Sequence, residues 1–466
     1  MYWKNSGSGQ PGEYEKNSMK KHGKLLVYLL GYLILAIMLA VFQPIWDPEG
    51  QTNPPDESVR FLVPRYVYAH GEIPTGLEEE IRIPGYGFSY ALYNAFPYIV
   101  MGMAMRLAGL FTSDTYALLL AARFVNVLAG LGMAYGVYCL SRMLFQTERN
   151  RWLFCLLVTF QPMNIFVHSY VNTDSFCMLS TAMITYGTVR MIRMKPDLKG
   201  SIVLAAGITL CALSYYSGFG FILAAVILFF ACLFRTTGEC SLSGESRFDK
   251  MRFWKYGGLI TVVVILGCGW WYIRTAIVLN GDFLGLRTRG EMVASYGLPQ
   301  FQYAETFAGR GSSIFEMIVQ MIQNRLPVRL TESLIAAYGM LNVRPGIWFY
   351  ALYLLVWGAG TAGAVSLLVR HLRSGIDPAG WRKWVFHGCM LFCIVMPLIL
   401  YLRYCYTMDY QEQGRYLLPA LIPAMIYVTK GLGRFGKWVV RSSMAVIVFC
   451  AVWQVFAVAL PAFGVW

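Results

Sequence analysis

The stretch LLVYLLGYLILAIMLAVFQ, residues 25–43, contains no charged residue and is long enough to cross a bilayer. A helix needs roughly 20 apolar residues to span a hydrocarbon core about 30 Å thick. The segment before it, residues 1–24, is polar and ends in KKHGK, and no small-residue cleavage site follows the apolar run. We therefore expect a basic cytoplasmic tail at 1–24 and a retained membrane helix that begins one transmembrane domain, residues 25–466.

Apolar runs of this kind recur along the whole chain. Hydrophobic residues make up 57% of the sequence and charged residues 14%, and the mean hydropathy is +0.50. A soluble globular protein is much less apolar, so the sequence predicts an all-α polytopic membrane protein. The predicted crossings lie near residues 25–43, 116–140, 152–169, 175–192, 201–216, 218–234, 257–279, 346–369, 384–402, 416–432 and 442–460.

One further segment, residues 88–111, is long enough to cross but is interrupted by Pro97 and Arg106. If it lies along the membrane surface, every lysine falls on the side of the N-terminus, as the positive-inside rule requires. If it crosses, several basic loops move to the opposite side. The lysines therefore predict eleven crossings of the plasma membrane, a cytoplasmic N-terminus, and two long outer loops at 44–115 and 280–345.

The net charge of +14 does not indicate a nucleic-acid-binding protein. The basic residues form short patches between apolar runs, which is typical of topology signals, rather than one stripe with interleaved aromatic residues. The cytoplasmic loops contain no glycine-rich phosphate loop, and the eleven cysteines show neither CxxC pairs nor His–Cys ligand spacing. Most acidic residues fall in the outer loops, so we expect extracytoplasmic chemistry driven by a lipid-borne substrate or an ion gradient.

Two outer motifs carry the candidate acids. In NPPDESVRF, two prolines cannot continue a helix, so Asp56 and Glu57 are presented on a fixed turn just above the membrane. In SYVNTDSF, Asn172 and Asp174 reach the same interface after the third predicted crossing. A solvated acidic turn and ordinary helix N-capping are the structural alternatives for these two motifs.

Two more outer motifs carry the candidate arginines. WWYIRTAIVLNGDFLG places Arg274 within an apolar run, where an arginine has a partner or snorkels to the interface. DYQEQGRYLLPALIP begins a crossing with Arg415, which opposes the helix dipole there, so we expect it to contact an anion. Arg403 in LRYCY is a further candidate for this contact. Asp282, Gln413 and Tyr416 lie in the same motifs and are candidate substrate-binding residues.

The four motifs bring acids and arginines from distant segments to one face of the membrane. Glycosyl transfer from a lipid-phosphate sugar needs such a set, because a carboxylate takes the proton of the acceptor hydroxyl while arginine stabilises the leaving phosphate. The candidate residues are Asp56, Glu57 and Asp174 for catalysis, Arg415, Arg274 and Arg403 for the donor phosphate or lipid, and Asn172, Asp282, Gln413 and Tyr416 for the substrate.

PPDE, YVNTD, WWYIRTAIVLNGDFLG, YGMLNV and QGRYLLPALIP occur here in that order. In this they resemble a family of bacterial multi-pass membrane proteins that looks like a branch of the GT-C glycosyltransferase superfamily, which includes protein O-mannosyltransferases and aminoarabinose transferases. The resemblance extends from about residue 25 to the C-terminus. It implies a GT-C-like fold with amphipathic surface helices in the first outer loop, a polyprenyl-phosphate-linked sugar donor, and inverting transfer to a glycan, lipid or protein acceptor on the outer face.

By similarity to that family, the first-loop acid, Asp56 or Glu57, is the catalytic base, and Asp174 assists. Family members often carry histidine where this chain has Arg60. Some GT-C enzymes use a divalent cation held by acidic motifs. The outer loops contain no DxD motif, so no metal ligand is assigned and a requirement for Mg or Mn is left open.

Two alternatives remain from the sequence. A lipid-linked oligosaccharide polymerase would use an arginine-rich outer loop, as found at 280–345. A flippase or transporter of lipid-linked sugar would carry ionisable residues near the bilayer midplane, for which Arg123 is a candidate, and often an inverted repeat.

Overall fold

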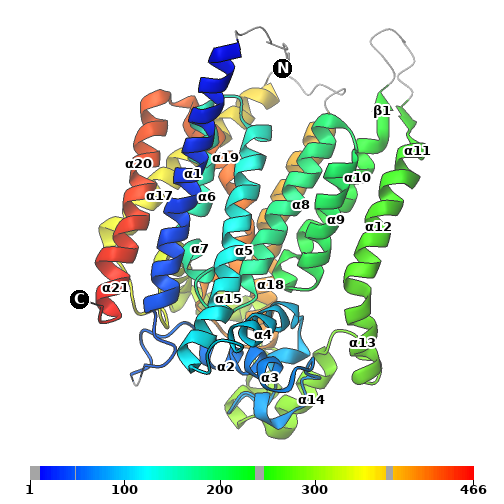
Figure 1. Ribbon diagram of the computed structural model, residues 1–466, viewed down its shortest axis with the longest axis vertical. Helices are drawn as coiled ribbons and strands as arrows, with labels where there is room; N and C mark the ends of the chain where they lie inside the picture. Colours follow the sequence, from blue (N-terminus) through cyan, green and yellow to red (C-terminus); the bar gives the residue numbers. More distant parts are fainter. Residues whose placement is uncertain (1–10, 48, 237–245, 374–380, 466) are drawn as a thin grey trace.

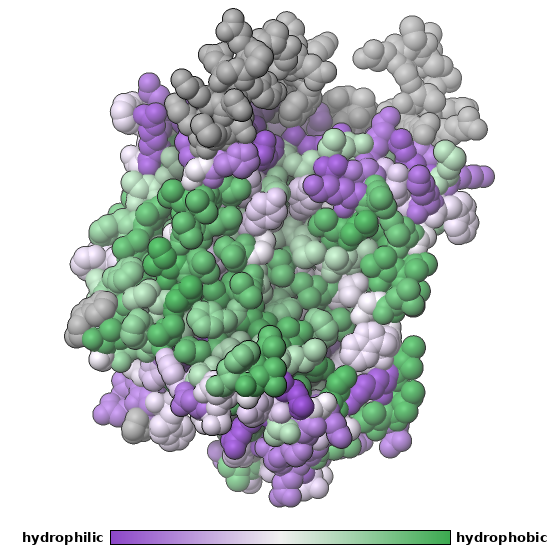
Figure 2. Space-filling model, viewed as in Figure 1, coloured by the Kyte–Doolittle hydropathy of each residue, from purple (hydrophilic) through white to green (hydrophobic). Residues whose placement is uncertain are grey.

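Long helices run side by side through the middle of the protein (Figure 1), and on the face shown in Figure 2 hydrophobic side chains form a band between two hydrophilic ends. The computed structural model describes residues 11–47, 49–236, 246–373 and 381–465. Within these ranges, eight helical segments are long and apolar enough to cross a membrane. They are α1 (Pro11–Phe42), α5 (Thr115–Leu144), α10 (Phe219–Leu233) with the turn before it, the continuous segment α11–α13 (Lys250–Val278), α17 (Ile347–Arg373), α18 (Trp381–Thr407), α19 (Leu421–Arg434) with the turn before it, and α20–α21 (Lys437–Ala462).

The other three predicted crossings are also helical, but each is short or polar. The third is divided into α6 (Glu148–Thr159) and α7 (Pro162–Val167), because proline cannot continue the hydrogen-bond ladder of α6. Helix α8 (Asp174–Met194) buries many serine and threonine side chains, and α9 (Leu198–Ala212) has only 15 residues. Both run alongside the longer helices (Figure 1). The predicted number of eleven crossings is therefore not confirmed.

The segment that was ambiguous in the sequence does not join the long helices. Its helix, α4 (Phe96–Ala108), has 13 residues and lies across one end of the bundle with α2 (Glu57–Arg60) and α3 (Leu62–His70) (Figure 1). Helix α14 (Leu286–Tyr296) lies at this same end. We call the end that carries the two predicted outer loops the loop end. Besides α4, the helices of those loops are α2 (Glu57–Arg60), α3 (Leu62–His70), α14 (Leu286–Tyr296), α15 (Ile314–Gln323) and α16 (Leu326–Ala336).

A small β-pair lies at the opposite end of the bundle (Figure 1). Strands β1 (Phe234–Thr236) and β2 (Ser246–Phe248) are antiparallel, with Phe234 opposite Phe248. Apart from this pair, the regular structure of the described ranges is helical, which confirms the predicted all-α class. Two of the long segments consist of several α-helical parts. The first contains α11 (Lys250–Arg252), α12 (Gly258–Val264) and α13 (Trp270–Val278), and the second contains α20 (Lys437–Trp453) and α21 (Leu460–Ala462).

Three glycines allow α17 and α19 to pack closely. Gly360 and Gly363 on α17 face Gly431 on α19, and a Cβ added to Gly431 would overlap the carbonyl oxygen of Gly360. Small residues at helix crossings let two backbones approach within a membrane. This crossing helps to position α19, the helix that follows one of the candidate arginines.

We expect Gly431→Ala to lower the thermal midpoint of the purified protein, because overpacking a close helix crossing costs about 1–3 kcal/mol. Gly358→Ala is the matched control, since Gly358 lies on α17 with nothing within 4 Å of its added Cβ. Thermal unfolding in detergent measures both. Equal midpoints for the two variants would contradict the packing described for α17 and α19.

Candidate functional site

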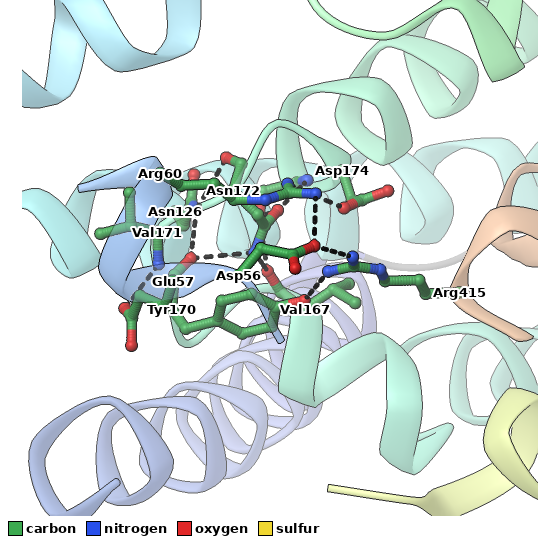
Figure 3. A network of polar contacts seen from close by, with 11 residues as sticks. Asp56, Glu57, Arg60, Asn126, Val167, Tyr170, Val171, Asn172, Asp174 and Arg415 are labelled. Atoms are coloured by element: carbon green, nitrogen blue, oxygen red, sulfur yellow. Dashed lines mark hydrogen bonds and ion pairs between the residues drawn. The ribbon is translucent and has the colours of Figure 1, made fainter. Parts of the chain in front are cut away.

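Asp56 stands at the start of α2 in a left-handed backbone conformation, with φ +62. The amide of Glu57 donates to the carbonyl of Pro54 at 3.2 Å, and the amide of Arg60 donates to the carbonyl of Asp56 at 2.8 Å. A non-glycine residue in this conformation costs about 1 kcal/mol or more, so its surroundings hold it there. The turn sends the side chains of Asp56 and Glu57 to different partners (Figure 3).

The carboxylate of Asp56 forms ion pairs with two buried arginines. Its Oδ2 accepts from Nη2 of Arg415 at 2.9 Å and lies 3.5 Å from Nη2 of Arg60. Its side chain is 30% exposed, whereas those of Arg415 and Arg60 are 3% and 7% exposed. Burial raises the pKa of Asp56, but the charges and hydrogen bonds of Arg415 and Arg60 outweigh burial and hold that pKa below its ordinary value. Asp56 is therefore ionised at neutral pH.

The same two arginines reach the loop that precedes α8. Asp174 is the first residue of α8, and its Oδ2 lies 3.9 Å from Nη1 of Arg60. Nη1 of Arg415 donates to the hydroxyl of Tyr170 at 2.7 Å. Arg415 itself follows Gly414 in a 3-10 turn that leads into α19. Three segments far apart in the sequence thus meet around one carboxylate, as the outer motifs predict (Figure 3).

Glu57 belongs to a separate, fully buried ion pair with Arg123 of α5. Nε and Nη2 of Arg123 donate to the two carboxylate oxygens at 2.9 and 2.5 Å, and both side chains are 0% exposed. Nη1 of Arg123 also donates to the carbonyls of Ala40 and Gln43, at 2.8 and 2.7 Å. The amide of Val171 donates to Oε1 of Glu57 at 2.8 Å. This pair fastens the first loop to the end of α1 and to the loop before α8.

Some donors at the site have no protein acceptor. Among the described residues, the buried Nε atoms of Arg60 and Arg415 lack a hydrogen-bond partner. An unmet buried donor costs about 1–3 kcal/mol, so such groups call for an explanation. The guanidinium of Arg60 lies over the ring of Tyr90 at 4.9 Å, and that of Arg415 lies 5.6 Å from the ring of Tyr416. Unused guanidinium donors beside aromatic faces suit an oxygen-rich anion.

The remaining substrate candidates take different places. Nδ2 of Asn172 donates to the carbonyls of Val167 and Tyr170, at 2.7 and 2.9 Å, so it shapes the loop before α8. Gln413 precedes the 3-10 turn of Arg415, and its buried Oε1 has no partner among the described residues. Tyr416 packs within an aromatic cluster formed by Tyr215, Tyr401 and Tyr404.

Three candidates lie outside the Asp56 network. Nη2 of Arg274 donates to the carbonyls of Ile73 and Pro74, at 2.7 and 3.0 Å, and so supports the first outer loop. Asp282 accepts from the amide of Thr288 at 2.8 Å, within the first turn of α14. Arg403 is exposed on α18, and no contact within the described ranges joins it to Asp56.

Three residues of the site were not assigned there from the sequence. Arg60 lies one helical turn after Asp56, a spacing at which side chains meet, so this signal was present. From the sequence, Arg123 is a candidate intramembrane charge, and such a charge by default has a partner. Tyr170 is the tyrosine of the YVNTD motif, but nothing in that motif distinguishes it from an ordinary interfacial tyrosine.

A divalent cation does not fit this donor set. Within the described ranges, no group of three or more His, Cys, Asp or Glu residues could hold a metal ion. The two nearest carboxylates, Asp56 and Asp174, both face the guanidinium of Arg60. The Mg or Mn ion that the sequence left open therefore has no ligand set at this site.

Comparisons with known proteins agree with this architecture. The profile of the family described as "Predicted membrane protein (DUF2142)" matches residues 78–423. The chain is similar to the oligosaccharyltransferase AglB from Archaeoglobus fulgidus, solved with an inhibitory peptide and a dolichol-phosphate, with 13% identity and a TM-score of 0.52 over 95% of this chain and 56% of that chain. It is also similar to the arabinofuranosyltransferase AftD from Mycobacteria, with 13% identity and a TM-score of 0.51 over 93% of this chain and 26% of that chain. No curated protein matches the sequence.

The chain thus spans about half of the first of these structures and about a quarter of the second. At these identities the likeness concerns the fold, and it confirms the GT-C-like fold that the sequence motifs implied.

Proposed function

Because the chain belongs to the DUF2142 family of predicted membrane proteins and has a GT-C-like fold, we propose that it is a glycosyltransferase. It moves a sugar from a polyprenyl-phosphate-linked donor to an acceptor on the outer face of the plasma membrane. The observation that carries this proposal is one carboxylate, Asp56, held between two buried arginines that keep unused donors. That one structure with this fold contains a dolichol-phosphate supports the lipid-linked class of donor.

In the proposed reaction, Arg415 and Arg60 hold the donor phosphate through the donors that the protein leaves unused. The acceptor oxygen forms a bond to the anomeric carbon as the bond from that carbon to the phosphate oxygen breaks. The electron pair leaves with the phosphate, and the acceptor proton passes to Asp56. Attack from the face opposite the phosphate inverts the anomeric configuration.

Donor binding also activates the base in this scheme. Without donor, Arg415 and Arg60 hold the pKa of Asp56 below its ordinary value. A phosphate that shares those guanidinium groups weakens their pull on the carboxylate and adds a negative charge nearby, so the pKa of Asp56 rises. The carboxylate thus becomes a better base only when the donor is in place.

The neighbouring residues have supporting roles. We assign the base to Asp56 and not to Glu57, because Arg123 and Val171 occupy both carboxylate oxygens of Glu57. Asp174 orients Arg60, and Asn172 holds the loop that presents Asp174. Gln413 and Tyr416 lie on the same turn as Arg415, and we assign the contacts with the sugar to them.

The orientation follows from the lysines and from the place of the site. Asp56 lies in the first long loop, at the end of the bundle opposite the β-pair (Figure 1). We propose that this loop end faces the outside and that the N-terminus is cytoplasmic. The transporter alternative loses its main support, since Arg123 is fully paired with Glu57 and cannot serve as a mobile intramembrane charge.

Reconstitution tests the proposal. The purified protein in liposomes is incubated with a panel of polyprenyl-phosphate sugars and an extract of the host's envelope glycans, and sugar transfer is followed by mass spectrometry. We expect transfer from at least one lipid-phosphate donor. Transfer that proceeds from a nucleotide sugar without any lipid carrier would contradict the proposal.

We expect Arg415→Met to weaken binding of undecaprenyl phosphate by about tenfold or more, because one strong charge-assisted contact is lost. Arg403→Met is the matched control, since Arg403 is exposed and lies outside the Asp56 network. Arg415→Lys keeps the charge but loses the bidentate fork, so its affinity should fall between those of Arg415→Met and the wild type. Native mass spectrometry measures carrier binding. Equal affinities for the Arg415→Met and Arg403→Met proteins would place the phosphate elsewhere.

A further inference from the structure

A cleft lies at the loop end, beside the ends of α17, α20 and α21. Its volume is about 880 Å³, which is within the range of small-molecule sites. Residues from three segments line it: Asp47, Glu49, Gln51 and Thr52 from the first outer loop, residues 342–346 with Trp348, and part of 453–464. None of the residues of the Asp56 network is among its lining residues, so its occupant is distinct from the donor phosphate.

Asp47 organises the first wall through hydrogen bonds to its side chain. Its Oδ2 accepts from the amides of Gln51 and Thr52, each at 2.9 Å, and its Oδ1 accepts from the amide of Glu49 at 3.0 Å. These hydrogen bonds, foremost the one from the Thr52 amide, lower the pKa of Asp47 to about 2. The Asp47 carboxylate is therefore already satisfied and is a poor ligand for a cation. The side chains of Glu49 and Gln51 are exposed beside the cleft.

The second wall follows α16 and carries Asn342 and Arg344. Nη1 of Arg344 forms an ion pair with Glu332 at 3.0 Å, so its charge is already compensated. Asp47 and Glu49 also line the cleft, so its lining carries more negative than positive charge. A phosphate or other anionic headgroup is therefore disfavoured here.

The third wall is aromatic. Trp348 and Trp453 are 41% and 40% exposed, and their ring centroids lie 5.7 Å apart at an angle of 74°. The C–H face of a sugar ring packs on an indole, while its hydroxyl groups bond to carboxylates and amides. Indoles that line one cleft together with Glu49, Gln51 and Asn342 thus match a neutral, polyhydroxylated ligand better than an ion or an acyl chain.

The cleft and the Asp56 site are connected through two segments of the chain. Gln51 and Thr52 lead into the proline turn that carries Asp56, and the backbone carbonyl of Gln51 accepts from the amide of Met340 at 3.0 Å. Helix α16, which precedes the lining residues 342–346, supports the arginine turn, because the amide of Gly414 donates to Oγ of Ser333 at 2.7 Å. The lining segments are therefore connected, through the chain after Thr52 and through α16, to the two segments that form the ion pair of Asp56 with Arg415.

We propose that this cleft binds a neutral saccharide, through Trp348 and Trp453 on its apolar side and Glu49, Gln51 and Asn342 on its polar side. That this saccharide is the glycan part of the acceptor rests on the proposed function. Saccharide binding itself does not depend on it. The acceptor class is then a glycan or glycoconjugate rather than a bare peptide or an unglycosylated lipid.

Saturation-transfer NMR tests the cleft directly. The protein in phosphatidylcholine nanodiscs is titrated with cellotetraose, chitotetraose, maltotetraose and mannotetraose. We expect at least one tetrasaccharide to bind saturably, and Trp453→Ala to weaken its binding by about tenfold or more. Glu49→Gln should weaken binding less and leaves the fold intact, since Glu49 is exposed. Trp270→Ala is the matched control, because Trp270 is 39% exposed but lies on α13, outside the cleft.

Three outcomes would overturn the proposal that the cleft binds a saccharide. They are that no tetrasaccharide binds, that binding survives both Trp453→Ala and Glu49→Gln, or that phosphatidylglycerol in the nanodisc displaces the sugar. The Asp56→Asn protein separates this proposal from the proposed function, because it should keep saccharide binding. Tetrasaccharide binding that depends on Trp453, in a protein that transfers no sugar from any lipid-phosphate donor, would support the cleft while opposing the proposed transferase.

Discussion

Sugar transfer by the Asp56→Asn protein is expected to fall by about 10²- to 10⁴-fold, which is the usual contribution of a general base. Asparagine keeps the size of the side chain, accepts a hydrogen bond from Arg415, and tolerates the left-handed backbone found at this position. The fold and carrier binding should therefore survive while proton transfer is lost. Initial rates in proteoliposomes measure the loss, and native mass spectrometry measures carrier binding.

The matched control for Asp56→Asn is Glu72→Gln, which changes an exposed acid of the same loop. Its rate should stay within about twofold of the wild type, because surface changes away from a site have small effects. If the Asp56→Asn protein retained more than half of the wild-type rate, Asp56 would not be the base, and the role of the two arginines would need another explanation.

The pH dependence gives a second readout of Asp56. In the free protein the pKa of Asp56 is lowered. The carboxylate therefore stays charged when the pH falls to the ordinary pKa of aspartate, about 4. The acid limb of kcat/KM, which reports the free enzyme, should therefore lie below that pH. Donor phosphate counteracts the arginines, so the acid limb of kcat should lie at higher pH. If the acid limbs of kcat and of kcat/KM lay at the same pH, donor binding would not activate the base.

Arg123→Met should cause the largest loss of stability, because it leaves the carboxylate of Glu57 buried without its partner. Removing one member of a buried ion pair typically costs about 3–5 kcal/mol. The carbonyls of Ala40 and Gln43 would lose their donor as well. We expect a much lower thermal midpoint and lost transfer activity, since α2 and Asp56 depend on this anchor. Thermal unfolding in detergent and the transfer assay measure the two effects.

The double variant Glu57→Gln with Arg123→Met tests the reason for that loss. Neutralising both partners removes the unpaired charge, so the double variant should be more stable than Arg123→Met alone. Lys24→Met is the matched control for breaking an ion pair, because Lys24 and Glu148 are each 57% exposed, and such pairs contribute about 0–1 kcal/mol. A double variant no more stable than Arg123→Met would show that Glu57 is not held as an anion.

Much of the fold can be predicted from the sequence, because a bilayer imposes one length and one polarity on every crossing. Lysine placement also predicts that residues 88–111 do not cross, and α4 lies accordingly at the loop end. The count of crossings was less predictable. A single proline at the start of α7 divides one apolar run, and the buried serines and threonines of α8 make a buried helix look polar.

The candidate site could be located from the sequence but not resolved into roles. Asp56 and Glu57 are adjacent, yet their side chains have different partners. This difference depends on the left-handed backbone at Asp56 and on Arg123, which is 66 positions from Glu57. Neither feature is visible in the motif itself. Arg274 carried the same signal of an intramembrane arginine as Arg123, yet it binds backbone carbonyls of the first loop instead of a carboxylate.

A structure of the protein with undecaprenyl phosphate bound would test the central claim most directly. The account predicts that the phosphate contacts the guanidinium groups of Arg415 and Arg60, including the Nε atoms that lack a protein partner, with Asp56 next to the space for the sugar. A phosphate bound away from both arginines, with the ion pair between Asp56 and Arg415 intact, would contradict it.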